Sequence, residues 1–339
     1  MTHPLVARFR EFAESECKDS SPLYYSLSHS VAGDDSILAV AAQSAAGQPA
    51  PNLFFASVHY LLLTGAADPL SAYYATLTPS PLPPAEAGAH LRNFVLNHCE
   101  EIVPLLKSRL VQTNEVRRSA YLFPALTLAA SHFESRPLAL VEIGTSAGLN
   151  LLWDKYQYTY GPGAAYGDLS SPVHIASSFC GTLPAILAAP MPVVSRRIGL
   201  DLNIVDSTVP DQAAWLRALI WPEHDDRRHL MDAALKHRAK FALDLRAGDG
   251  FAILPALERD VPIESLLCVY HTHVANQIPP EARECFLETI AGIGAHRDVI
   301  HLFNNIKPAL HLTVYRDGTR IIDAPVANTD GHARWIEWI

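Results

Sequence analysis

Residues Leu138–Asn150 read LALVEIGTSAGLN, and this stretch decides the fold. Its first six residues form a short run, apolar except for Glu142, that is typical of a buried β-strand. Gly144 and Gly148 mark a turn directly after that run, and a stretch typical of a helix follows up to Gln157. The sequence therefore predicts a strand, a glycine turn and a helix in direct succession.

Beyond this stretch, short apolar runs alternate with helical patterns. We expect strands in Arg197–Leu202, Phe241–Gly250, Leu266–Tyr270 and Asp298–Asn304, and helices in Asp211–Trp221, Arg228–Arg238 and Pro280–Ile293. Such alternation predicts βαβ units, and hence an α/β fold with a mostly parallel, Rossmann-like sheet and helices on both faces. A closing hairpin around Asp317-Gly318 should add an antiparallel edge.

The residues before this region have a different pattern. Residues 1–133 contain apolar residues at helical spacing, with a buried helix at Leu53–Leu63, one long amphipathic helix spanning Leu91–Leu106 and another helix at Tyr121–Ser131. We predict two domains, a helical N-terminal cap over 1–133 and the sheet domain over 134–339. Residues 158–195, rich in Tyr, Gly, Pro and Ser, read as an insertion with a short hairpin.

The composition excludes several classes of function. Apolar residues make up 49% of the 339 residues and charged residues 18%, which favours a large buried core. The formal charge is −9 and no basic stripe is present, so we expect no nucleic-acid partner. The five cysteines form no C-x-x-C pair, no signal peptide is recognisable, and the longest apolar run is too short to span a bilayer. We therefore predict a cytoplasmic protein with no membrane partner and no metal.

Three chemistries use a turn like Gly144–Gly148. A dinucleotide loop, G-x-G-x-x-G, fails because Ser146 occupies the place of the second glycine. A nucleophile elbow, G-x-S-x-G, matches literally and would make Ser146 the nucleophile of a hydrolase. An S-adenosylmethionine loop reads acidic-x-Gly-x-x-x-Gly, which also matches, with Glu142 as the acidic residue. A plain strand-to-helix turn is the fourth reading.

The surroundings favour the S-adenosylmethionine loop. A hydrolase elbow follows several earlier strands, whereas here the preceding residues read as helices. Glu142 would also place a carboxylate close to a developing oxyanion, which needs hydrogen-bond donors. In the cofactor reading, by contrast, the same carboxylate helps to hold the cationic end of the ligand, and the small residues allow close approach of the backbone.

The chain also resembles a known family. The resembling pieces include Thr113-Asn114-Glu115 with Arg118, EIGTSAGLNLLWDKYQY from Glu142, RIGLDLNIVD from Arg197, and the closing GHARWIEW. As a set they are similar to a bacterial family of methyltransferase-like proteins known only as a domain of unknown function, within the class I methyltransferase superfamily. The resemblance implies a fold and S-adenosyl-L-methionine as the cofactor, and it does not supply a reaction.

The resemblance also implies residue roles. Asp201, 59 residues after Glu142, would bind the ribose hydroxyls, with the insertion accounting for the long separation and Asp206 as the weaker candidate. Asp249 would accept from the adenine amino group, or instead cap the next helix. Arg118 could pair with the methionine carboxylate, or with a surface acid. The expected cofactor-binding set is Glu142, Gly144, Ser146, Gly148, Asp201, Asp249, Arg118 and Asn114.

Three further residues are candidates for catalysis. His271, or alternatively His273, follows a strand whose carboxyl end should face the ligand crevice, and it could be a general base. Asn304 closes the next strand and could orient a substrate. Tyr156 begins a cluster with Tyr158, Tyr160 and Tyr166 that could form an aromatic box around the sulfonium cation. Structural packing is the alternative for each.

The sequence leads to a ranked set of functions. First is an S-adenosylmethionine-dependent transferase of small-molecule metabolism or biosynthesis that moves a methyl or other alkyl group to a small substrate. Second is cyclisation of the cofactor itself to azetidine-2-carboxylate, with release of methylthioadenosine. A Ser146 hydrolase and a non-catalytic binding module are the remaining alternatives. The sequence indicates neither the substrate nor the oligomeric state.

Overall fold

The computed structural model describes residues 3–339, which form two compact units. The helical unit comprises the residues up to Thr113 together with Thr208–His229, and the sheet unit comprises Asn114–Ser207 and Leu230–Ile339. These limits differ from a division at residue 133. Helix α7 (Ser119–Ala130) belongs with the sheet because it packs beside β9 and β10, and α8 (Pro210–Ala218) belongs with the helical unit because it packs on α4.

The helical unit is built around α4 (Ala50–Leu63), which is buried on nearly all sides. Rings of Phe9, Phe54 and Phe55 meet edge to face in this core. The predicted single helix over Leu91–Leu106 is wrong, because the backbone of His98 leaves the helical region (φ −113°, ψ 21°) and separates α5 from α6. The other helices of this unit are α1 (Leu5–Phe12), α2 (Pro22–Ala32), α3 (Asp35–Ala41), α5 (Ala87–Asn97) and α6 (Cys99–Ser108).

The sheet unit contains a nine-stranded sheet with the order β5-β12-β11-β10-β9-β8-β1-β6-β7. Five adjacent strands are parallel to one another: β9, β8, β1, β6 and β7. Strands β10 and β11 add the antiparallel edge that the sequence predicts. The strand bounds are β1 (Leu138–Ile143), β6 (Val194–Asp201), β7 (Asp244–Ala247), β8 (Leu266–His271), β9 (Val299–Phe303), β10 (Leu310–Arg316), β11 (Thr319–Thr329) and β12 (Trp335–Trp338). A large mixed sheet with helices confirms the α/β class.

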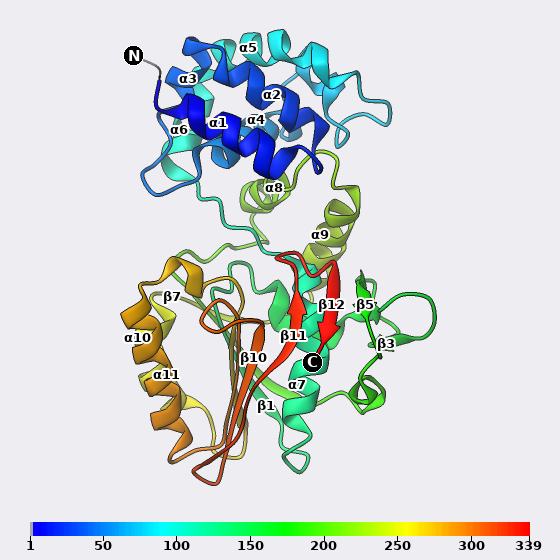
Figure 1. Cartoon of the computed structure of the whole chain (residues 1–339), viewed down its shortest axis with the longest axis vertical. Coiled ribbons are helices and arrows are strands. Elements are labelled where there is room, and N and C mark those ends of the chain that lie inside the picture. Colours follow the sequence, from blue (N-terminus) through cyan, green and yellow to red (C-terminus); the bar gives the residue numbers. More distant parts are fainter. Residues whose placement is uncertain (1–2) are drawn as a thin grey trace. The chain divides into compact units, whose positions relative to one another are not determined.

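Helices cover both faces of this sheet (Figure 1). On one face, α10 (Gly250–Asp260) and α11 (Pro280–Gly294) enclose an apolar core with β1, β6, β8 and β9. On the other face lie α7 and the 3-10 helix η5 (Leu149–Lys155). Helix α9 (Asp225–Arg238) precedes β7 in the chain. All six residues of β1 are buried, as expected for a central parallel strand covered on both sides.

The insertion forms a separate three-stranded sheet with the order β3-β2-β4. Its strands are β2 (Gln157–Thr159), β3 (Ala165–Gly167) and β4 (His174–Ala176), and β2 and β3 are antiparallel, which confirms the predicted short hairpin. The next strand, β5 (Ser178–Cys180), instead joins the large sheet beside β12. The insertion therefore fills the chain between β1 and β6 and accounts for the long separation of Glu142 from Asp201.

Candidate functional site

The parallel strands bring the predicted polar residues to one edge of the sheet. Glu142 is the last residue but one of β1, and Asp201 is the last residue of the neighbouring β6. Asp249 follows β7, His271 ends β8 and Asn304 follows β9. In parallel sheets this edge is where ligands bind, at the point where the strand order reverses. Here the reversal falls between β1 and β8.

The loop from Gly144 to Gly148 is held in an unusual backbone conformation. Gly144, Ser146 and Gly148 have φ angles of +76°, +52° and +77°. A Cβ on Gly144 would lie 2.1 Å from Val274 Cγ2, and a Cβ on Gly148 would lie 2.6 Å from Leu243 Cδ1. Both glycines are thus required by the left-handed backbone and by close contact with the protein itself. The segment that follows is a 3-10 helix with a kink at Leu152, not the regular helix expected.

Glu142 is a buried carboxyl group, only 2% exposed. The Thr145 hydroxyl donates a hydrogen bond to its Oε2 at 2.7 Å. Burial raises the pKa of Glu142 to about 8, and the charge of Asp201 adds to that rise, while Thr145 and Arg118 oppose it. The group is therefore largely protonated at neutral pH, and a cation placed beside it would favour its ionised form.

Asp201 ties the loop to the second strand. Its Oδ2 accepts from the backbone N–H of Ser146 at 2.8 Å, and its Oδ1 accepts from that of Asn203 at 3.0 Å. A carboxylate offers about four acceptor positions, so two remain for other donors. Glu142 and Asp201 therefore flank one loop, and Asp201 is fixed to it by a backbone hydrogen bond.

Thr145 is a site residue that the sequence reading left without a role. Besides holding Glu142, it fits against Gly199, where an added Cβ would lie 2.5 Å from Thr145 Cγ2. The glycine of the RIGLDL stretch therefore makes room for the residue that positions the acid. That pairing connects two strands and cannot be read from either one alone.

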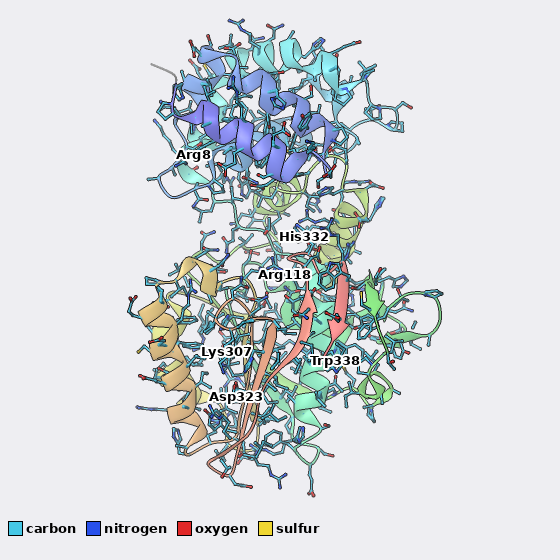
Figure 2. The ribbon with its side chains drawn as sticks, viewed as in Figure 1. Arg8, Arg118, Lys307, Asp323, His332 and Trp338 are labelled. Carbon is cyan, nitrogen blue, oxygen red and sulfur yellow. The ribbon has the colours of Figure 1, made fainter. Side chains whose placement is uncertain are left out.

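Residues 114–118 join the loop to the C-terminal segment. Asn114 Oδ1 accepts from the backbone N–H of Leu149 at 3.3 Å, which gives it a capping role on η5. Arg118 Nε donates to the carbonyl of Gly331 at 3.1 Å, and His332 Nδ1 lies 3.0 Å from Glu115 Oε2. Arg118 and His332 accordingly lie near each other at this end of the sheet unit (Figure 2).

His271 occupies a position that is at odds with the role of general base. It is fully buried among the rings of Phe251, Phe286, His301 and Phe303, and neither ring nitrogen has a hydrogen-bond partner within residues 3–339. Register explains why: Ile143 pairs with His271, and both face α10 and α11 rather than η5. Burial also lowers the pKa of His271 to about 3, so it is a poor proton acceptor.

The catalytic role of Tyr156 stays a prediction, and its surroundings are those of a packed core residue. It is fully buried, and its hydroxyl donates to the carbonyl of Leu149 at 2.6 Å. The Tyr158 hydroxyl donates to the carbonyl of Trp153, and that of Tyr160 donates to Ala120 at 2.6 Å. Tyr158 and Tyr160 pack the insertion against α7, with Tyr158 stacked on Phe123 at 4.8 Å. The tyrosines are packed with their hydroxyls bound to backbone carbonyls, and the aromatic box around a sulfonium stays a prediction.

Asp249 and Ser146 have simple local environments. Asp249 is the N-cap of α10, its Oδ1 accepting from the backbone N–H of Phe251 at 2.9 Å, and its side chain is exposed. The Ser146 hydroxyl is buried and has no hydrogen-bond partner in the described chain. A serine nucleophile needs a base within reach of that oxygen, and the described residues supply none. The adenine contact of Asp249 stays a prediction.

Asn304 and His273 lie together beside a cavity of about 460 Å³. Asn304 is buried, and its Oδ1 accepts from the backbone N–H of His273 at 2.7 Å. Burial, together with the nearby charges of Arg118 and His332, lowers the pKa of His273 to about 4. The predicted orienting residue thus lines a space that a small molecule can occupy, and His273 rather than His271 borders it.

Comparison with known protein families shows the family to which the chain belongs. Residues 6–338 match the family described as "uncharacterized protein conserved in bacteria (DUF2332)". The chain belongs to this family. No curated protein and no solved structure matches it. Within residues 3–339 of this DUF2332 protein, no helix is long and apolar enough to cross a bilayer, and no group of three or more His, Cys, Asp and Glu side chains is arranged to hold a metal ion.

Proposed function

We propose that this DUF2332 protein is an S-adenosyl-L-methionine-dependent transferase that acts on a small molecule. One observation carries the proposal: two carboxyl groups, Glu142 and Asp201, flank a left-handed glycine loop at the ends of neighbouring parallel strands. Asp201 is bound to that loop through the N–H of Ser146. The two acids lie close enough for the charge of Asp201 to raise the pKa of Glu142.

The order of the strands supports the same proposal. Counted along the chain, the five parallel strands β1, β6, β7, β8 and β9 are arranged 3-2-1-4-5. These are the first five positions of the doubly wound order 3-2-1-4-5-6, in which the ligand binds across the strand ends at the reversal. The resemblance to a class I methyltransferase sheet rests on this order and on the motifs, and the proposal extends it to the cofactor.

Each residue has a distinct part in the proposed site. Glu142 would hold the cationic end of the cofactor, and the free acceptor positions of Asp201 suit two vicinal ribose hydroxyls. Arg118, on the same side as Glu142, suits the carboxylate of the methionine portion. When bound, the cofactor supplies a carbon activated by its positive sulfur. The contribution of this chain is to orient that carbon and to keep water away from it.

The alternatives have less support from the residues. Cyclisation of the cofactor calls for a tight aromatic pocket, and Tyr156, Tyr158 and Tyr160 instead pack the insertion with their hydroxyls bound to backbone carbonyls. The hydrolase reading has in its favour the positive φ of Ser146, which a nucleophile elbow also shows. It lacks a base at the hydroxyl.

The proposal is tested by incubating the full chain with methyl-labelled S-adenosylmethionine. Calorimetry would measure binding, and mass spectrometry would follow the label with and without a metabolite panel. We expect micromolar binding that Glu142→Gln and Asp201→Asn weaken, with Asp260→Asn as the control. Asp260 is a 66% exposed carboxylate at the far end of α10. Absence of binding would overturn the proposal, and methylthioadenosine formed without transfer would favour cyclisation.

A further inference from the structure

The cavity beside Asn304 is bounded by the end of β9 and by the strands of the antiparallel edge. It holds about 460 Å³, enough for a small metabolite. The residues around it are mostly polar: His273, Asn304, Asn305, Lys307, Ala309, Leu310, Asn328, Thr329, Trp335 and Glu337. Arg118 lies near both the cavity and Glu142, because its charge lowers the pKa of His273 and that of Glu142.

The backbone around this cavity is strained. His273, Asn305 and Ala309 all line it, and they have φ angles of +57°, +66° and +63°. Left-handed backbone is unfavourable for residues other than glycine, and such residues gather at ligand sites. His273 Nε2 is also buried without a hydrogen-bond partner within the described residues. A polar atom left unpaired in this way is unfavourable unless a water or a ligand completes it.

The charges around the cavity are unequal. The positive charge of Lys307 is balanced by Asp323, because its Nζ lies 2.8 Å from Asp323 Oδ1 (both residues are labelled in Figure 2). Glu337 accepts a hydrogen bond from Asn328 Nδ2 at 3.0 Å and has no cationic partner in the described part of the chain. Trp335 adds an indole, whose face attracts cations. The unbalanced charge is therefore negative.

We infer that this cavity binds the acceptor substrate and that the substrate is a small amine. Its ammonium group would be recognised by Glu337 and Trp335, and its polar groups by the amides of Asn304 and Asn328. The inference deepens the proposed function and rests on it for the reaction. In the transfer, the bound ammonium first loses a proton to water; the lone pair of the neutral amine nitrogen then bonds to the methyl carbon, and the carbon–sulfur bond breaks with its electron pair left on sulfur, which leaves a methylated ammonium and a neutral thioether.

Binding of size-matched probes to the full chain without cofactor tests the cavity separately from the crevice. Benzylamine and benzoate share one ring and carry opposite charges, and NMR titration would give their dissociation constants. We expect benzylamine to bind at least tenfold more tightly than benzoate. Glu337→Gln should remove that preference, whereas Glu264→Gln, an exposed acid outside the cavity lining, should keep it.

Two results would overturn the inference: preference for benzoate, or benzylamine binding that is the same in wild type and Glu337→Gln. Failure of both probes to bind would also overturn it. Because the cofactor is absent from this titration, these results leave the cofactor proposal intact. Conversely, amine binding in a chain that does not bind S-adenosylmethionine would refute only the proposed reaction.

Discussion

At the ends of β1 and β8, the two faces of the sheet give a buried ionisable group different surroundings, polar on one face and aromatic on the other. Glu142 points toward η5, receives a hydrogen bond from Thr145 and lies within reach of the charge of Arg118. His271, paired in register with the next residue of β1, points toward α10 and α11 and is enclosed by aromatic rings. Burial shifts both pKa values toward the neutral form, but only Glu142 has polar neighbours. The comparison teaches that a one-residue step along a strand separates a ligand-facing group from a core group.

The largest expected effect is a loss of stability at low pH, caused by the buried histidines on the face of the sheet that packs against α10 and α11. His271 and His301 are buried and neutral in the folded chain, with pKa values of about 3 and well below the ordinary value of 6.5. Both are free to protonate when unfolded, so the free energy of unfolding should fall as the pH drops below about 6.5. Between pH 7 and pH 5 the shift of His271 contributes a loss of about 2 kcal/mol, and His301 adds a loss in the same direction.

Urea denaturation at pH 7 and pH 5 measures this loss. His271→Leu with His301→Leu should flatten the acid limb and, by removing unsatisfied polar groups, should not lower stability at pH 7. His59, in the helical unit, has a pKa lowered to about 4 by burial, but its nitrogens lie 3.1 Å from Ala218 O and 2.8 Å from Thr76 Oγ1. The acid loss that His59 contributes should persist in the double variant. An unchanged acid limb in that variant would contradict the assignment.

The second effect concerns the ligand-facing group. Glu142→Gln keeps the size of the side chain and removes its charge, so S-adenosylmethionine should bind about a hundredfold more weakly, in line with the loss of one partner of a buried charge pair. His271→Leu should leave that affinity within about twofold, because His271 lies on the other face. Calorimetry compares the two variants. Equal loss of affinity in both would show that the faces do not differ as the structure indicates.

Sequence patterns predicted most of the architecture and part of the difference between Glu142 and His271. The parallel central strands could be anticipated because Leu266–Tyr270 is apolar throughout and Leu138–Ile143 is apolar except for Glu142, as buried parallel strands are. The face of the sheet on which His271 lies could not be anticipated, because a strand that is apolar on both faces shows no alternation of polar and apolar residues to distinguish them. Likewise the hydroxyls of Tyr156 and Tyr158 bond to carbonyls five or more residues away, and a Tyr-rich composition does not reveal such partners. The break at His98 was missed because the apolar spacing continues across it.

The third effect sharpens the role of Glu142 through pH. Burial raises its pKa to about 8, so in the free protein it must lose a proton before it can pair with a cation. Affinity for S-adenosylmethionine should therefore rise with pH by up to about tenfold per unit below pH 8 and level off above it. Titrations from pH 6 to 9 measure this slope. Subtracting the profile of Glu142→Gln removes the titration of the ligand itself, and identical profiles for the two proteins would refute the link.

The smallest effect is expected at Ser146, which lies between the two carboxyl groups. Its backbone N–H bonds to Asp201, whereas its hydroxyl has no partner within residues 3–339. Ser146→Ala retains the backbone contact, so cofactor affinity should change by less than about threefold and stability by less than about 0.5 kcal/mol, as for a substitution that removes no interaction. A serine-directed phosphonate should label neither protein. Labelling of the wild type that Ser146→Ala abolishes would instead make the hydroxyl a nucleophile, and the two acids would then need a different explanation.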